Sequence, residues 1–180
     1  MIKYRNSCLV IDVHKVFSTE DASTLFDFFQ SLHSWNPNRR QKLLYGDPGL
    51  EYKIVFKGKP VVYPVKPWIP EILHIKSQIE ALTGDNYTVC VVHYYPNGSI
   101  GINPHRDKEM IAGTTIVGLS LGAERTLEMS RGGKTTSIPL YNGSIYILYP
   151  PTNDFWAHCI PKDETSTPRI SLTFRNYKSS

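Results

Sequence analysis

The second half of the chain alternates short apolar segments with glycine-containing turns, and this pattern restricts the fold more than any other feature of the sequence. The turns contain Pro-Asn-Gly, Leu-Gly-Ala, Arg-Gly-Gly and Tyr-Asn-Gly. Many short strands at close spacing indicate a β-sandwich or barrel, and the jelly roll is a double-sheet form whose interior can hold a site. The predicted strands are 87–95, 114–121, 125–129, 135–139, 144–149 and 169–175.

The first half begins with a predicted strand at residues 8–13 and a helix after it. Ser18 has the pattern of a helix N-cap, with Asp21 three residues on. Apolar side chains then recur at helical spacing through Leu32. A further strand is predicted over residues 52–56.

Two stretches of the first half are expected to lack regular structure. Residues 33–50 are rich in turn-forming residues, and Pro60, Pro64 and Pro67 interrupt the stretch after residue 56. A helix is predicted from about 70 to 83. Its apolar side carries Ile72, Ile75, Ile79 and Leu82.

Together these elements predict an α+β, β-rich fold, in which helices pack outside a jelly-roll core, also called a double-stranded β-helix. A chain of 180 residues is the size of one domain. We expect residues from about 1 to 85 to supply the outer helices, and residues from about 86 to 180 to supply the core.

The composition favours an intracellular, soluble protein in the nucleus or cytoplasm. The three cysteines, Cys8, Cys90 and Cys159, are odd in number and far apart, which disfavours a disulfide framework or a cysteine-based zinc site. No segment approaches the roughly 18 uninterrupted apolar residues that a membrane span requires. The net charge of +4 permits a polyanionic partner without requiring one.

His105 and Asp107 are the first candidates for chemistry, because side chains two positions apart in an extended segment project from the same face. They can offer one nitrogen and one oxygen to a metal ion. His158 is the strongest candidate for a third ligand. Two histidines and one carboxylate with open positions form the facial triad of non-haem iron(II) oxygenases. The alternative for His-x-Asp alone is an ordinary solvated loop.

The last predicted strand is the second signal, because its polar and apolar residues alternate. Arg169, Ser171, Thr173 and Arg175 share one face. They could line a pocket for a small dianion, since the arginine fork matches carboxylates. An edge strand with its polar face in water would show the same pattern. Six residues of strand span roughly 20 Å, so the two arginines must lean inward, the strand must bend, or one arginine must act indirectly.

These motifs together resemble the AlkB family of iron(II)/2-oxoglutarate dioxygenases, which reverse alkylation of nucleobases. The family combines His-x-Asp, a distal His and Arg-x-Asn-x-Thr-x-Arg. Tyr94-Tyr95-Pro-Asn-Gly98 and Pro150-Pro-Thr-Asn-Asp-Phe-Trp156 match the segments that precede the two histidines. Tyr45-Gly-Asp-Pro-Gly49, Tyr52 and Lys66-Pro-Trp-Ile-Pro70 resemble the nucleotide-recognition region of the eukaryotic DNA-repair members. The resemblance covers roughly residues 35–177.

The resemblance implies three groups of functional residues. The catalytic iron(II) ligands would be His105, Asp107 and His158. The 2-oxoglutarate site would contain His93, Tyr95, Arg169, Ser171, Thr173 and Arg175. Substrate-binding residues, in an N-terminal nucleotide-recognition lid and beside the iron ligands, would be Leu32, Arg40, Tyr45, Tyr52, Ile54, Arg106, Lys108 and Glu109.

Three positions depart from the family pattern. His93 and Ser171 stand where the family has asparagine, which puts 2-oxoglutarate binding in question, although both can hydrogen-bond. Leu32 stands where the duplex-repair member has an aromatic residue that fills the gap left by a flipped base. This favours single-stranded substrates, from which a base is extruded at least cost.

The implied function is iron(II)/2-oxoglutarate-dependent oxidative demethylation of 1-methyladenine or 3-methylcytosine in DNA, with molecular oxygen as oxidant and formaldehyde as product. We expect a monomeric oxidoreductase that acts in direct alkylation repair of DNA or RNA. One alternative is an RNA demethylase, or a protein or small-molecule hydroxylase, on the same core. Another is a catalytically impaired nucleic-acid-binding module.

Overall fold

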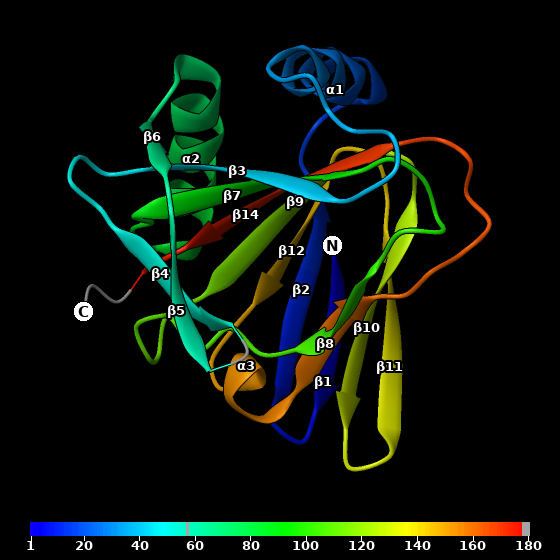
Figure 1. Cartoon of the computed structure of the whole chain (residues 1–180). Helices are drawn as coiled ribbons and strands as arrows, with labels where there is room; N and C mark the ends of the chain where they lie inside the picture. The colour runs from blue at the N-terminus through cyan, green and yellow to red at the C-terminus, as the bar shows by residue number, and fades with distance from the viewer. Residues whose placement is uncertain (57, 178–180) are drawn as a thin grey trace.

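Two β-sheets face one another and enclose an apolar core, with the two longer helices outside the larger sheet (Figure 1). The structure, a computed structural model, describes residues 1–56 and 58–177. The larger sheet consists, in spatial order, of β1 (Ile2–Asn6), β2 (Leu9–Lys15), β12 (Ser144–Leu148), β9 (Ile116–Gly122), β14 (Arg169–Arg175), β7 (Val89–Tyr95), β3 (Gln41–Gly46) and β6 (Val65–Pro67). The smaller sheet consists of β11 (Lys134–Leu140), β10 (Arg125–Arg131), β13 (Ala157–Ile160) and β8 (Ile102–His105). The predicted β-rich jelly-roll core is therefore confirmed.

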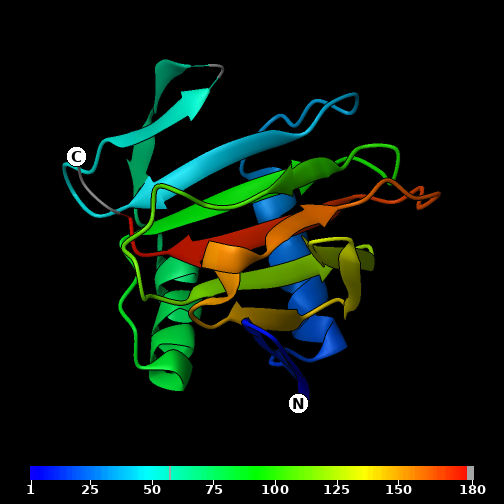
Figure 2. The ribbon, with the colours of Figure 1, turned by 90° about the horizontal axis from the view of Figure 1, so that it is seen from below.

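The helices α1 (Thr19–Ser31) and α2 (Pro70–Thr83) cover the outer face of the larger sheet (Figure 2). The Ser18 side chain accepts a hydrogen bond from the backbone N–H of Asp21, as the N-cap pattern predicts. Phe29 of α1 and Ile75 of α2 are buried in one cluster with the outward-facing residues of the sheet. Because the helices cover this face, polar residues of the strands concentrate on the other one.

β14 lies in the centre of the larger sheet, between β9 and β7, and all seven of its residues are buried. Ile170, Leu172 and Phe174 belong to the helix-side cluster. The polar residues that alternate with them lie on the opposite face, which is turned toward the smaller sheet. The alternative of an edge strand with a solvated polar face is wrong.

The expectation of irregular structure in residues 33–50 and after residue 56 is wrong in part. Gln41–Gly46 forms β3, which pairs antiparallel with β7, while turn residues flank it on both sides. Lys59–Tyr63 forms β5, which pairs with β4 (Tyr52–Phe56) in a separate two-stranded sheet. The prolines are tolerated because β5 has one neighbour and β6 is the edge of the large sheet, so their missing N–H groups break no central ladder.

Several smaller elements were not predicted, namely β1, β8, β13 and the single turn α3 (Thr152–Phe155). Leu82, expected on the buried side of α2, is 45% exposed, whereas Ile72, Ile75 and Ile79 are buried. None of the helices within residues 1–56 and 58–177 combines the length and the apolar composition needed to cross a membrane.

Candidate active site

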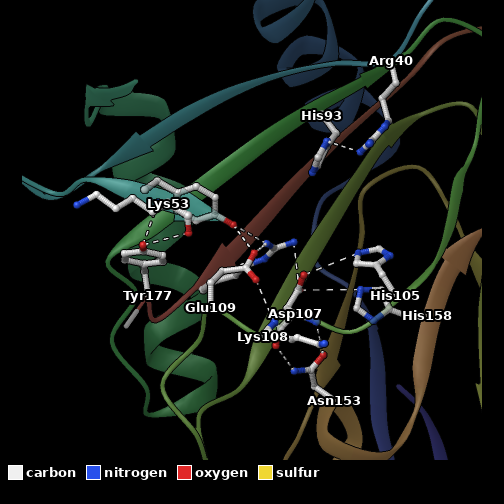
Figure 3. Close-up of polar contacts among 12 residues, drawn as sticks. Arg40, Lys53, His93, His105, Asp107, Lys108, Glu109, Asn153, His158 and Tyr177 are labelled. Atoms are coloured by element: carbon white, nitrogen blue, oxygen red, sulfur yellow. Dashed lines mark hydrogen bonds and ion pairs between the residues drawn. The ribbon is translucent and has the colours of Figure 1, made fainter. Parts of the chain in front are cut away.

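Two histidines from neighbouring strands of the smaller sheet meet a carboxylate at its edge. His105 of β8 and His158 of β13 are direct cross-strand partners, and their ring centroids lie 4.3 Å apart. Asp107 follows two residues after β8 ends. Its Oδ1 is 3.8 Å from His105 Nε2, and its Oδ2 is 4.0 Å from His158 Nε2 (Figure 3). One ligand atom from each residue lies within 4.8 Å of the others, so the three can hold one metal ion.

Neighbouring groups fix the ring of His105 and the backbone of Asp107. His105 Nδ1 lies 2.9 Å from the backbone carbonyl of Asn103. A carbonyl only accepts, so Nδ1 carries the proton and Nε2 keeps the lone pair that a metal requires. Asn153 of α3 holds the backbone of Asp107 from both sides: its Oδ1 accepts from the Asp107 N–H at 3.0 Å, and its Nδ2 donates to the Asp107 carbonyl at 2.7 Å.

The protonation states of the buried groups suit metal binding. Burial and the nearby His105 and Arg175 lower the pKa of His158 to about 4, against the opposing effect of Asp107. The imidazole is therefore neutral at pH 7. Burial alone would raise the pKa of Asp107, but the cationic Arg175 and the two histidines outweigh it and lower that pKa. His158 thus offers a neutral nitrogen and Asp107 an ionised carboxylate, a pair of ligands that fits iron(II).

The residues expected to bind 2-oxoglutarate line one cavity between the sheets, together with the two histidines. These residues are His93, Tyr95, Arg169, Ser171, Thr173 and Arg175. Arg169 is 1% exposed, and its Nε donates to the Ser120 hydroxyl at 2.8 Å. Within the described part of the chain, its buried Nη1 has no hydrogen-bond partner. A buried guanidinium with one unsatisfied edge fits a carboxylate ligand.

Arg175, at the other end of β14, is already engaged by acidic groups. Its Nη2 lies 3.1 Å from Asp107 Oδ2, and its Nη1 lies 3.3 Å from Glu109 Oε1. The same Nη1 donates to the Tyr52 hydroxyl at 3.0 Å. Although burial acts to lower its pKa, the acidic neighbours outweigh this and raise the pKa of Arg175. The two arginines therefore have different surroundings, which agrees with the alternative that one of them acts indirectly.

Some of the predicted substrate residues join this network. The Tyr52 hydroxyl donates to Glu109 Oε1 at 2.6 Å, and burial raises the pKa of Tyr52, so the hydroxyl stays protonated. Arg40 Nη1 lies 3.2 Å from His93 Nδ1. Ile54, also in β4, is half-buried and packs against the small cluster that contains Tyr52.

Other predicted substrate residues lie elsewhere. Tyr45 is buried in the helix-side cluster, on the opposite face of the sheet from the cavity. Leu32, the C-cap of α1, packs against the same cluster. Arg106 and Lys108 are exposed and line a different hollow of about 670 Å³, which runs along the outer side of Asp107 toward Asn153. These four residues are therefore separated from the cavity that holds the histidines.

Several contributing residues escaped the sequence analysis. Asn153 lies within the quoted segment that precedes His158, but the sequence did not indicate that it bonds to the Asp107 backbone. Lys42 is half-buried, with its Nζ 3.4 Å from the centre of the Tyr63 ring. Tyr177 ties the chain end to β4, since its hydroxyl accepts from the Lys53 N–H at 2.9 Å. All three contacts join segments that are remote in sequence, and no local sequence pattern predicts them.

A jelly roll that places two histidines and a carboxylate beside a buried arginine defines a class, the non-haem iron(II) oxygenases. The family model of the 2OG-Fe(II) oxygenase superfamily matches residues 21–175. This chain belongs to that superfamily, and its relatives support the resemblance to the AlkB family found in its sequence. Membership implies iron(II), 2-oxoglutarate and molecular oxygen as cofactor, cosubstrate and oxidant.

Relatives and a solved structure agree with this assignment. The human DNA oxidative demethylase ALKBH2 is 31% identical over 159 residues, which are 81% of this chain and 59% of that protein. Alpha-ketoglutarate-dependent dioxygenase alkB homolog 3 from Bos taurus is 35% identical over 126 residues, 62% of this chain and 44% of that protein. The chain thus spans less than two thirds of these relatives. The structure of OsALKBH1 shares the fold, with a TM-score of 0.69, 18% identity, and 97% and 99% of the two chains covered.

Proposed function

We propose that this protein demethylates alkylated nucleobases in DNA by an iron(II)/2-oxoglutarate-dependent oxidation, with 1-methyladenine and 3-methylcytosine as substrates. The observation that carries the proposal is one cavity, lined by His105, His158 and the unsatisfied guanidinium of Arg169, with Asp107 close enough to complete a metal site with the two histidines. The names of the relatives, a DNA oxidative demethylase among them, support the choice of substrate.

In this proposal His105, Asp107 and His158 hold the iron, and Arg169 receives one carboxylate of 2-oxoglutarate through its free edge. The bound iron supplies the chemistry that couples oxidative decarboxylation of 2-oxoglutarate to hydroxylation of the N-methyl group. The Tyr95 ring packs against Arg169, whose Cζ lies 5.3 Å from the ring centre. This cation–π contact helps to hold the guanidinium in position. Residues His93, Ser171 and Thr173 complete the cosubstrate wall.

Tyr52 and Glu109 are proposed to face the extruded base. Both 1-methyladenine and 3-methylcytosine carry a positive charge on the ring, and a carboxylate favours such a ring over its neutral, unmethylated form. Arg175 bonds to both residues and therefore fixes their positions. Hydroxylation of the methyl group gives an unstable hydroxymethyl base, which loses formaldehyde and leaves the repaired base.

The β4–β5 hairpin and the residues around it, within 33–70, are proposed as the lid over this site. Leu32 packs against the helix-side core, which supports a preference for single strands, since a duplex enzyme needs a residue to fill the gap left by the base. We further propose a monomeric, single-domain protein that acts inside the cell, in the nucleus or cytoplasm. Gel filtration of the purified chain would test the monomer.

The test is an anaerobic preparation that receives iron(II), 2-oxoglutarate and then air, with oligonucleotides carrying 1-methyladenine. Single-stranded DNA, duplex DNA and RNA versions are compared, and formaldehyde and succinate are both measured. We expect formaldehyde from the single-stranded DNA, and none from His105→Ala or Asp107→Ala. Succinate without formaldehyde from any oligonucleotide would instead indicate a protein or small-molecule hydroxylase. Neither product from iron-loaded protein would indicate an impaired binding module.

A further inference from the structure

His93 and Ser171, the two positions of the cosubstrate motifs that depart from the AlkB pattern, are direct partners across β7 and β14. Both side chains are buried, and both line the cavity that contains Arg169. Histidine is larger than the asparagine of the family pattern, whereas serine is smaller. Because the two residues are cross-strand partners on the same face, the size of one side chain bears on the space available to the other.

Arg40, which precedes β3, supplies the contact that gives His93 a defined chemical state. Arg40 Nη1 lies 3.2 Å from His93 Nδ1, and Figure 3 shows the second ring nitrogen on the side away from Arg40. A guanidinium has donors and no acceptor, so Nδ1 must be the accepting nitrogen. Burial, together with the positive charges of Arg40, Arg175 and Lys42, lowers the pKa of His93 well below its ordinary value. The ring is therefore neutral, and its one proton is on Nε2.

We propose that Arg40 is a positioning residue that holds His93 in the Nε2–H tautomer, so that His93 presents an N–H donor to bound 2-oxoglutarate where the family pattern has an asparagine amide. This inference rests on the proposed function, which supplies the ligand. The opposite tautomer would turn an imidazole lone pair toward the oxygens of an anion and repel it. The hydrogen bond from Arg40 excludes that tautomer. His93 therefore still offers an N–H donor, as the asparagine of the family pattern would.

The first test reads the tautomer directly, by long-range ¹⁵N–¹H correlation NMR on metal-free protein. We expect the Nε2–H form of His93 in the wild type, a mixture of tautomers in Arg40→Leu, and the Nε2–H form again in Arg40→Lys, whose ammonium also only donates. The matched control is Arg39→Leu, which removes the same charge from an exposed neighbour. A wild-type Nδ1–H tautomer would overturn the proposal.

The second test measures the 2-oxoglutarate dissociation constant by calorimetry with Mn(II) bound and without turnover. Arg40→Leu should weaken binding by roughly tenfold, the loss of about one hydrogen bond to an anion, and Arg39→Leu should not. In a His93→Asn background, Arg40→Leu should add almost no further loss, because no tautomer remains to be set. Equal effects of Arg40→Leu in both backgrounds would overturn the inference.

The two failures are distinguishable. A wild type that binds 2-oxoglutarate and demethylates DNA, while Arg40→Leu behaves like Arg39→Leu, overturns this inference and leaves the proposed function standing. A wild type that binds no 2-oxoglutarate with Mn(II) overturns the proposed function and the cosubstrate part of the inference together. Thermal melting of each variant confirms that the fold is retained.

Discussion

Arg175 and Asp107 form a buried ion pair, with 3.1 Å between Nη2 and Oδ2, at the centre of the candidate metal site. The guanidinium also bonds to Tyr52 and Glu109 through Nη1. One side chain from the central strand of the larger sheet therefore joins an expected iron ligand to residues expected to face the substrate. Iron binding, the β4 strand and the position of Glu109 are physically linked through it.

Replacing Arg175 with Leu should destabilise the metal-free protein by about 3–5 kcal/mol, because the buried Asp107 carboxylate loses its partner. Urea denaturation measures the loss. The double variant Arg175→Leu/Asp107→Asn should recover part of it, since position 107 no longer carries an unpaired buried charge, while Glu109 still lacks its partner. An Arg175→Leu protein as stable as the wild type would show that the pair carries no net stabilisation.

Replacing Asn153 with Ala should weaken metal binding by about 10- to 100-fold, the usual cost of losing a group that orients a ligand. Both hydrogen bonds to the Asp107 backbone are lost, so the carboxylate is no longer held toward the histidines. Chelator competition with Co(II) measures the affinity. Asn38→Ala, an exposed asparagine, is the control. Equal affinities for the two variants would contradict the role assigned to Asn153.

The Lys42 amine should titrate near pH 8. Burial is the largest cause, followed by the positive charges of Arg175 and Arg40, while Glu109 acts in the opposite direction. NMR of the lysine ε-carbon against pH measures this value. Glu109→Gln should lower the Lys42 pKa further, and Arg40→Leu should raise it. A titration at the ordinary lysine pKa in the wild type would refute the assignment.

His93→Asn should reduce the loss of folding stability that the wild type shows in mild acid. The pKa of His93 is lowered in the folded protein, so below about pH 6.5, the ordinary histidine value, the unfolded chain binds a proton that the folded chain refuses. The contribution of His93 to the free energy of unfolding is therefore complete above this pH and is lost as the pH falls below it. Asparagine removes this contribution, while His158, whose pKa is also lowered, retains its own. Urea denaturation at pH 7.5 and pH 5.5 measures the difference, and identical slopes would contradict it.

The sequence was most informative where a local pattern coincides with the tertiary arrangement. The Ser18 cap, the apolar side of α2 apart from Leu82, and the short strands of the core follow from local spacing, and the structure confirms them. β3, β5 and β6 were missed because their strand character depends on partners remote in sequence. Turn residues and prolines dominate their local signals, and the edge positions that tolerate those prolines are visible only in three dimensions.

The candidate site shows the same division. His-x-Asp, the distal His158 and the polar face of β14 are sequence features, and the structure brings the triad together. Asp107 nevertheless lies beyond β8, and its orientation depends on Asn153 rather than on strand alternation alone. The length of the strand indicated that both arginines could not simply bind one small diacid, but the acidic partners of Arg175 could not be predicted.

The central place of β14 has a consequence for biosynthesis. β7 and β9 both pair with β14 and flank it in the sheet, yet they are made long before residues 169–175 leave the ribosome. Until then the strand edges that face β14 have no permanent hydrogen-bonding partner. An unpaired edge exposes a nascent chain to misassembly and to capture by chaperones. Arg169 and Arg175 arrive with the same strand. The cosubstrate pocket therefore forms only after residues 169–175 have left the ribosome, and a ribosome stalled before residue 169 would carry both metal-binding histidines without a completed site.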